Sequence, residues 1–322
     1  MNNTVITGNK ILSHIDRIVN SHRPITADVF LNNYCNNSCP YCTYRRWEFE
    51  DGARFMPYDD FVKYAKRMRK LGIEGIILSG GGEPTIAKDF DRIVQWLDDH
   101  YYPYGINTNF NRYVLCRPRY LKVSLDGWSE DSYEKRRGVR AYGQVRENII
   151  RFAAEKPMET NLGIQLLATH ANDVYHFWEA NKDLPVDYIV IRPVESTGGK
   201  YYKHVAVDNE IGAQPKDIIE AIRHVQEIDD RVVMNYKWQM LGMEFPNCIG
   251  QWSQLAVNEL GEVMYCCHKP FQIVGHIMDD DILDKKRIAL TDMQMCDVPC
   301  RLTGVNNDLT NLERKVKDFE FI

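Results

Sequence analysis

Three cysteines, Cys35, Cys39 and Cys42, lie within eight residues of one another. No fourth Cys or His is close by in the sequence, whereas structural zinc sites almost always have four protein ligands. Four-iron clusters also usually take four cysteines. A cluster that is held by only three thiolates leaves one iron open to another ligand. The three cysteines alone leave one alternative open, a zinc site that a distant residue completes.

A second group of cysteines follows much later in the chain. Residues 258–262 predict a hairpin turn between strands at 253–257 and 263–265. Such a hairpin would bring Cys248 and Cys266 together at one end. Further on, two more cysteines have C-x3-C spacing, and four thiolates suit zinc and a four-iron cluster equally well. We therefore predict a second metal site near the end of the chain.

The elements that must position these residues alternate regularly from residue 26 onward. Strands that alternate with helices indicate βαβ units and a parallel sheet. About six units fit before residue 194, fewer than the eight of a TIM barrel. We therefore predict the α/β class and an open, partial (β/α)6 TIM-like barrel, with functional residues at the carboxyl ends of its strands. The predicted strands are 26–31, 75–78, 104–108, 120–125, 162–168 and 188–191, and the helices between them include 58–71, 87–98 and 143–154.

The chain divides into five predicted segments. The regular alternation of predicted strands and helices ends after residue 194. A helix is then predicted at 215–228, with Pro215 in its first turn. The segments are a leader helix (1–24), the barrel (25–206), a linker helix region (207–245), a small cysteine-rich domain (246–304) and a tail (305–322).

Two turns at predicted strand ends carry residues that could bind a ligand. Gly80-Gly81-Gly82-Glu83-Pro84 follows the second strand, and glycines there let the backbone approach a ligand closely. The Glu83 carboxylate could accept hydrogen bonds from an ammonium group. Ser124-Leu125-Asp126-Gly127 ends the fourth strand, where Ser and Asp can hydrogen-bond a ribose. Each turn taken alone is also a common connection between elements.

Together, and in this order on the βα ladder, the motifs resemble those of the radical SAM superfamily. The C-x3-C-x2-C spacing with Tyr41 before the last cysteine is similar to the signature of that family. The resemblance implies a [4Fe-4S] cluster on the first three cysteines that binds S-adenosylmethionine (SAM). It further implies that Gly81, Gly82 and Glu83 hold the amino group of SAM, and that Arg137 binds its carboxylate.

Further residues of the SAM pocket are expected from the same resemblance. The turn from Ser124 is similar to one at the fourth strand of many members, which implies ribose contacts by Ser124 and Asp126. Asn107, Gln165 and Arg192 lie at or near other strand ends. We treat them as pocket candidates, each with an alternative role in a turn or a cap.

The spacing Cys-x12-Gly-x4-Cys from Cys248 to Cys266 resembles the start of the SPASM and twitch extensions of this family. A full SPASM domain carries more cysteines than this chain offers. The resemblance therefore implies a twitch-type domain with one auxiliary [4Fe-4S] cluster on Cys248, Cys266, Cys296 and Cys300, and zinc is the alternative. Cys267 is left over, because neighbours on a strand point to opposite faces. It is either an inert buried thiol or a hydrogen-atom donor, as in radical epimerases.

The resemblance implies an enzyme that cleaves SAM reductively to a 5'-deoxyadenosyl radical. The radical would remove a hydrogen atom from a carbon of a polar small molecule, a sugar, aminocyclitol or nucleoside, and epimerisation or dehydrogenation would follow. The expected electron donor is a flavodoxin or a ferredoxin. One alternative is a peptide-modifying radical SAM enzyme, for which the leader of about 25 residues is short. The other is a non-enzymatic iron–sulfur or zinc regulator.

Composition and charge argue against a nucleic-acid-binding, membrane or secreted protein. The formal net charge of -5 argues against non-specific binding to nucleic acid. No apolar run approaches the length that crosses a bilayer, and the polar residues 1–10 do not resemble a signal peptide. Clustered cysteines without an export signal favour metal ligation over disulfides, and we expect a cytoplasmic protein.

Overall fold

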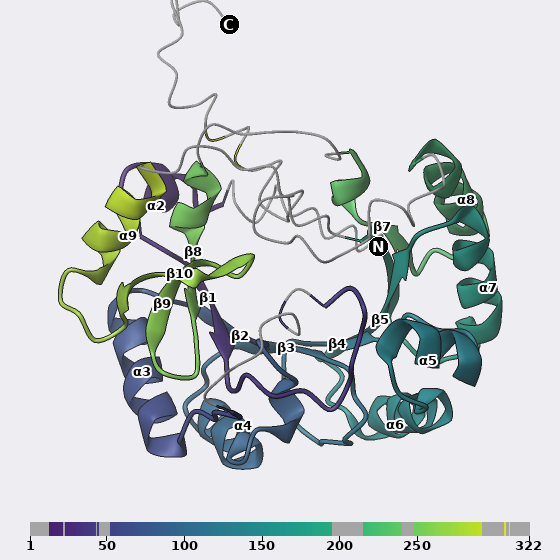
Figure 1. Ribbon diagram of the computed structural model, residues 1–322, viewed down its shortest axis with the longest axis horizontal. Helices are drawn as coiled ribbons and strands as arrows, with labels where there is room; N and C mark the ends of the chain where they lie inside the picture. The colour runs from purple at the N-terminus through teal and green to yellow at the C-terminus, as the bar shows by residue number, and fades with distance from the viewer. Residues whose placement is uncertain are drawn as a thin grey trace, which may run out of the picture.

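The computed structural model describes residues 13–21, 23–42, 44, 52–194, 215–239, 248–291, 306 and 309. Within these residues ten strands form one sheet, in the order β10-β9-β8-β1-β2-β3-β4-β5-β6-β7. The sheet curves into an open arc, and its outer side is covered by helices (Figure 1). The strands are β1 (Thr26–Phe30), β2 (Gly75–Ser79), β3 (Tyr104–Thr108), β4 (Tyr120–Ser124), β5 (Asn161–Ala168), β6 (Tyr188–Pro193), β7 (Val232–Met234), β8 (Gln254–Val257), β9 (Glu262–Cys266) and β10 (Lys269–His276).

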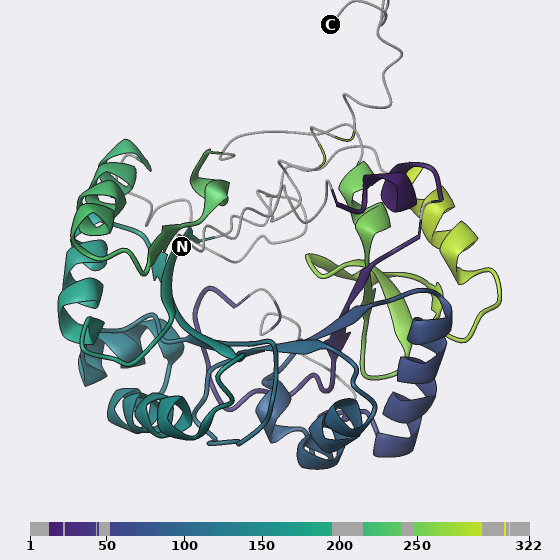
Figure 2. The same cartoon turned by 180° about the vertical axis from the view of Figure 1, so that it is seen from behind.

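The helices fall into two groups. Those on the convex side of the sheet, seen from behind in Figure 2, are α3 (Tyr58–Lys70), α4 (Phe90–Asp99), α5 (Glu130–Arg137), α6 (Tyr142–Glu155), α7 (Ala171–Asn181) and α8 (Pro215–Ile228). Two more, α2 (Ile15–Val19) and α9 (Ile282–Thr291), lie at the end of the arc near β8. Short 3-10 helices are η1 (Pro84–Ile86), η2 (Tyr236–Gln239) and η3 (Ile249–Ser253). None of the described helices combines the length and apolarity that crossing a membrane requires.

Strands β1 to β6 run parallel and pair in chain order, which confirms the predicted partial barrel. Along each strand, side chains alternate between the two faces of the sheet. On β2, Ile76 and Leu78 belong to the core that the helices cover, together with Phe61 and Met68 of α3. The residues between them, such as Ile77, point to the concave side. Polar residues at these alternate positions are therefore available to a site inside the arc.

One more parallel strand extends the barrel beyond the predicted six. β7 pairs with β6 after α8, so the segment predicted as a linker adds another βα unit. It is only three residues long, too short for a recognisable pattern. Helix α5 was not predicted either, because its sequence has no apolar stripe, although Tyr133 and Arg137 are buried. Instead, a capping box between Ser129 and Ser132 starts this helix.

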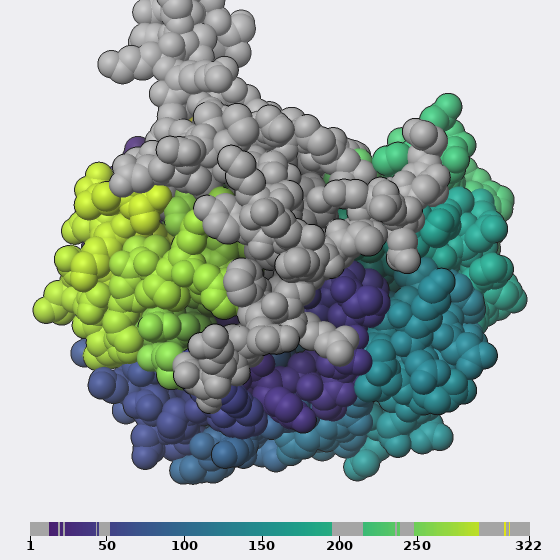
Figure 3. Space-filling view, viewed as in Figure 1, coloured from purple at the N-terminus to yellow at the C-terminus, as the bar shows by residue number. Residues whose placement is uncertain are grey.

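The predicted hairpin is present, and it joins the barrel. β8 and β9 are antiparallel around residues 258–262, while β8 also pairs in parallel with β1. Leu255 and Val257 share one apolar core with Ala27 and Val29, which explains the pairing. In Figure 3 the green and yellow C-terminal segments lie directly against the blue N-terminal ones. The cysteine-rich segment therefore continues the sheet, while the predicted domain boundaries remain predictions.

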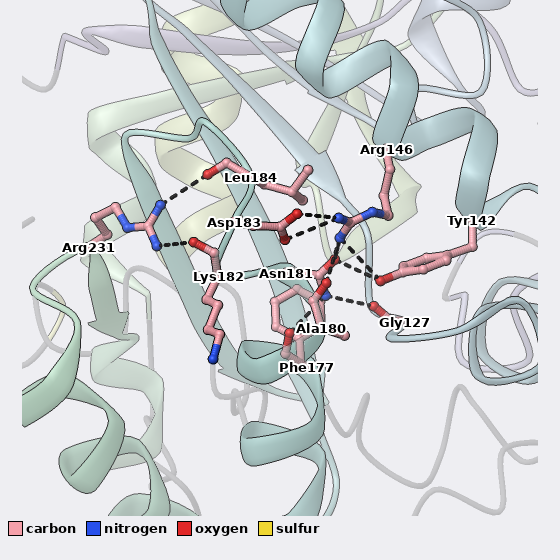
Figure 4. Close-up of polar contacts among 10 residues, drawn as sticks. All are labelled: Gly127, Tyr142, Arg146, Phe177, Ala180, Asn181, Lys182, Asp183, Leu184 and Arg231. Atoms are coloured by element: carbon pink, nitrogen blue, oxygen red, sulfur yellow. Dashed lines mark hydrogen bonds and ion pairs between the residues drawn. The ribbon is translucent and has the colours of Figure 1, made fainter.

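Two arginines hold the carboxyl end of α7 (Figure 4). Arg146 of α6 donates to both carboxylate oxygens of Asp183, at 3.0 and 3.1 Å. Arg231 donates to two backbone carbonyls of the same turn, at 2.7 and 3.0 Å. The fully buried Asn181 then donates to the carbonyl of Gly127 at 3.1 Å. The end of α7 thereby fixes the turn after β4, which carries predicted site residues.

Candidate functional site

The three N-terminal cysteines lie in a loop that follows β1 and enters the arc of the sheet (Figure 1). Cys35 is exposed, Cys39 is buried and Cys42 is intermediate. The Cys42 amide donates to the Cys39 carbonyl at 3.2 Å, which closes a tight turn. Among the described residues, no three side chains of His, Cys, Asp or Glu form a site for a single metal ion.

Side-chain amides join the cysteine loop to the loop after β3. Asn109 Nδ2 donates to Asn36 Oδ1 at 2.7 Å, and Asn111 Nδ2 donates to Asn37 Oδ1 at 2.6 Å. Asn109 Nδ2 also lies 3.9 Å from the sulfur of Cys35. These neutral hydrogen bonds position the loop, and one of them reaches a predicted cluster ligand.

The glycine-rich turn after β2 packs against the chain that enters the cysteine loop. The Gly82 amide donates to the Asn32 carbonyl at 3.0 Å, and the Glu83 amide donates to the Tyr34 carbonyl at 2.9 Å. A Cβ on Gly82 would lie 1.8 Å from the Tyr34 oxygen, and one on Gly81 would lie 3.3 Å from the Asn32 oxygen. Gly82 therefore cannot carry a side chain here, because two backbones meet at this point.

Glu83 is buried, and its carboxylate connects the turns after β2 and β3. It accepts hydrogen bonds from the Thr85 amide at 3.1 Å, the Thr85 hydroxyl at 2.7 Å and the Asn109 amide at 2.7 Å, and a further one from the Thr108 hydroxyl. Burial raises the pKa of Glu83, and these hydrogen bonds lower it in part. The predicted contact with the amino group of SAM remains a prediction.

Asp126 and Arg137 form a buried ion pair, with 3.0 Å between Nη1 and Oδ2. The other oxygen of Asp126 accepts from the Leu167 amide at 2.7 Å, and the Tyr41 hydroxyl donates to Oδ2 at 3.3 Å. Burial disfavours the charged form of Arg137, but Cys39 and Asp126 outweigh burial and raise its pKa well above the ordinary value. The pair thus links the turn after β4, the end of α5 and the cysteine loop. The predicted ribose and carboxylate contacts remain predictions.

The cysteine loop is hydrogen-bonded to the carboxyl end of α5. The Ser38 amide donates to the Arg137 carbonyl at 3.0 Å, and the Ser38 hydroxyl donates to the Gly138 carbonyl at 3.0 Å. The Cys39 thiol lies 3.7 Å from the same Arg137 oxygen. Gly138 has a φ of 75°, and a Cβ there would lie 2.6 Å from the Ser38 carbonyl oxygen. This contact leaves no room for a side chain at residue 138.

Replacement of Gly138 by Ala is expected to displace the cysteine loop and lower the iron bound per chain after reconstitution. Gly52→Ala is a matched control, because Gly52 has a φ of 73° but nothing within 4 Å of an added Cβ. Both changes cost about 1–2 kcal/mol of stability, since alanine disfavours the left-handed region. Only Gly138→Ala should also lose iron. Equal iron content in the two variants would contradict the docking role of Gly138.

The remaining predicted SAM contacts lie along β3 to β6. Ser124 and Gln165 are register partners, and Arg192 donates to Gln165 Oε1 at 2.9 Å. In the part of the chain that the structure describes, the buried Asn107 Oδ1 and the buried Arg137 Nε have no hydrogen-bond partner. Buried polar atoms of native proteins are normally paired. One acceptor and one donor can therefore bind a polar ligand here, and these residues fit SAM.

Two of the predicted auxiliary ligands are buried on neighbouring elements. Cys248 directly precedes η3, and Trp252 of η3 packs against the cluster of Tyr265 and Cys266. Cys296 and Cys300 lie outside the described residues. Two buried thiols are thus available on neighbouring elements, and the auxiliary metal site with its complete ligand set remains a prediction.

The leftover Cys267 lies apart from Cys266 and near the first cysteine loop. It begins the turn after β9, is partly exposed and packs against the cluster of Phe30 and Met264. Its carbonyl accepts a hydrogen bond from the Tyr44 hydroxyl, two residues after Cys42. Cys267 is therefore joined to a residue that directly follows the first cysteine loop. Cys116 lies in the core, as expected.

Several residues near the site were not predicted from the sequence. Asn107 was a predicted pocket candidate, and its spacing of two residues to Asn109 and Asn111 could have indicated a polar rim that includes Asn111. No local signal marks Tyr44, whose partner is 223 positions away. Lys286 was missed because a single lysine in a helix usually faces solvent.

A family model described as "Radical SAM superfamily" matches residues 29–169. A "Probable GTP 3',8-cyclase" of Saccharolobus solfataricus is 26% identical over 179 residues, which cover 53% of this chain and 57% of the relative. A protein of the same name from Pyrococcus horikoshii is 31% identical over 135 residues, covering 39% and 43%. The chain thus spans about half the length of these relatives.

Solved structures share the fold at low sequence identity. SuiB of Streptococcus suis, bound to its precursor peptide SuiA, has a TM-score of 0.62 at 14% identity, covering 88% of this chain and 70% of SuiB. The structure titled "Native anSMEcpe with bound AdoMet" has a TM-score of 0.61 at 16% identity, covering 83% of each chain. At this identity the likeness concerns the fold alone.

Proposed function

This chain belongs to the radical SAM superfamily, whose cofactors are a [4Fe-4S] cluster and SAM, and we propose that it abstracts a hydrogen atom from a polar small molecule. The substrate class comprises sugars, aminocyclitols and nucleosides, and the product is an epimer or a dehydrogenated compound. A flavodoxin or ferredoxin supplies the electron. A twitch-type auxiliary [4Fe-4S] cluster on the C-terminal cysteines assists. Relatives named GTP 3',8-cyclase support the nucleoside member of this class.

When bound, the cluster and SAM supply the 5'-deoxyadenosyl radical, and the protein's task is to bind and orient them. The three thiols of the loop after β1 would hold the cluster. Glu83 would accept from the SAM amino group through Oε2, which has one hydrogen bond from the protein. Arg137 would pair with the carboxylate through its buried Nε, while Asp126 holds the guanidinium in place. Ser124 and Asn107 would bind further polar groups.

One observation above all supports this proposal. The cysteine loop is held by three separate strand ends, through the glycine turn after β2, the asparagines after β3 and the Arg137 turn beyond β4. Beside it lie two buried polar atoms with no hydrogen-bond partner among the described residues. A regulator with a simple metal site needs no such arrangement of loops and polar atoms at the carboxyl ends of a parallel sheet.

Anaerobic reconstitution tests the class of protein. Iron and sulfide are counted first, and SAM cleavage is then measured with dithionite as reductant. Two four-iron clusters predict about eight irons per chain, with release of 5'-deoxyadenosine. Zinc, or iron without SAM cleavage, would instead favour the regulatory protein. The likeness to the peptide-bound SuiB concerns the fold and does not favour a peptide substrate.

Replacement of Cys267 by Ala distinguishes the two reactions. Cys267 is partly exposed and its carbonyl is bonded to Tyr44, so we expect its thiol to return a hydrogen atom to the substrate radical. The thiyl radical left on Cys267 would take one electron from the flavodoxin or ferredoxin and one proton from solvent. The variant should then cleave SAM but form no epimer from a panel of sugars, aminocyclitols and nucleosides. In D2O the unmodified chain should place one solvent deuterium on the inverted carbon. Unchanged product formation by Cys267→Ala, with no deuterium incorporated, would indicate dehydrogenation.

A further inference from the structure

Lys286 occupies a core position on a helix where an apolar residue is expected. Ile282 and Ala289, one turn away on either side, belong to the apolar clusters beneath α9. Lys286 is only 4% exposed. The preceding residue of the helix, Lys285, has a side chain that is 41% exposed and pairs with surface carboxylates at 2.9 and 3.0 Å. The two neighbouring lysines therefore sit in opposite environments.

The buried ammonium group has a single hydrogen bond within the part of the chain that the structure describes. Its Nζ donates to the carbonyl of Tyr265 at 3.0 Å, next to Cys266. No carboxylate of the described residues lies within ion-pair distance of Lys286. Buried charges in proteins are normally paired, because removal from water costs several kcal/mol. Within that part of the chain, Lys286 therefore has no carboxylate in direct contact to balance its charge.

Cys266 lies next to the group that holds this ammonium: it follows Tyr265, whose carbonyl accepts the hydrogen bond, and it packs in one apolar cluster with Ala289 of α9. Burial lowers the pKa of Lys286 to about 8, while Cys266, Cys248, Cys267 and Asp28 raise it in part. Two of these thiols are predicted ligands of the auxiliary cluster. A four-iron cluster with four thiolates carries net negative charge, and reduction adds one more electron. The potential of such clusters depends on net charge, hydrogen bonds and exposure.

We propose that Lys286 is the counter-ion of the auxiliary cluster and raises its reduction potential. The inference rests on the auxiliary cluster of the proposed function. The buried positive charge stabilises the more negative, reduced state more than the oxidised state. Lys286 is a positioning residue in this sense, because it acts through the cluster and touches no substrate.

The experiment uses the full chain with Cys35, Cys39 and Cys42 replaced by Ala, in which only the auxiliary cluster can form. Lys286→Met, Lys286→Arg and Lys285→Met are compared in this background by redox titration followed with EPR. At the midpoint potential of the parent, Lys286→Met should lower the ratio of reduced to oxidised cluster at least tenfold, a shift of 59 mV for one electron. Lys286→Arg and Lys285→Met should keep the ratio of the parent.

The iron content of the variants also distinguishes a counter-ion from a packing role of Lys286. Loss of iron from Lys286→Met but not from Lys286→Arg supports the counter-ion, because arginine keeps the positive charge and methionine removes it. An unchanged ratio in Lys286→Met, or equal loss of iron from both Lys286 variants, overturns it and leaves a packing role. If the parent binds no iron in this background, instead of about four atoms, the auxiliary cluster itself is wrong. That failure is separate from a cluster that forms with an unchanged potential.

Discussion

Replacement of Cys39 by Ala is expected to abolish the cleavage of SAM to 5'-deoxyadenosine. Cys39 is the buried member of the cysteine loop, and the Arg137 guanidinium partly offsets the rise in its pKa that burial causes. With two thiolates left, the loop cannot hold a four-iron cluster with one open site. Iron after reconstitution should fall by about four atoms per chain, and 5'-deoxyadenosine should fall to the level of a blank without protein.

Cys116→Ala is the control for this prediction. Cys116 is also buried, and burial raises its pKa to about 12, but it lies in the apolar core. Its replacement should cost about 1 kcal/mol of stability and leave iron content and SAM cleavage unchanged. If Cys39→Ala still cleaves SAM at the unmodified rate, the reactive cluster is not on this loop.

Replacement of Asp126 by Asn is expected to lower the free energy of unfolding by about 3–5 kcal/mol, because it leaves the Arg137 charge buried without its partner. The change keeps the shape of the side chain, and asparagine tolerates the φ of 53° at this residue. The Leu167 amide can still donate to the remaining carbonyl oxygen. Urea denaturation of the reconstituted and the metal-free chain measures the loss of stability.

The same variant should also weaken cluster binding, because the Arg137 carbonyl accepts from the Ser38 amide in the cysteine loop. Asp131→Asn is the matched control, since Asp131 pairs with Arg140 at 3.0 Å but its side chain is 88% exposed. Exposed pairs contribute about 0–1 kcal/mol. Equal effects of the two changes on stability would show that the buried pair does not hold the site.

The cysteine site and the main barrel could both be predicted from sequence, for the same reason. The spacing of Cys35, Cys39 and Cys42 is local, and so is the alternation of apolar strands with amphipathic helices. The pairing of β1 to β6 in chain order then follows from short connections. The hairpin around residues 258–262 is equally local. Metal ligands and elements that depend on residues close in sequence can thus be predicted from the sequence.

Contacts between distant segments were decided by the tertiary structure alone. The Asp126–Arg137 pair joins a turn to a helix end. Tyr41, which donates a hydrogen bond to Asp126, lies 85 positions away in the sequence. β8 adds to β1 across most of the chain, and β7 is too short to show a pattern. Lys286 is bonded to the Tyr265 carbonyl beside Cys266, and not exposed to solvent, only because α9 packs on β9 and β10. The sequence by itself determined which groups can bind iron. Packing of remote segments decided which charges and amides surround them, because no local pattern encodes a contact that only the folded sheet creates.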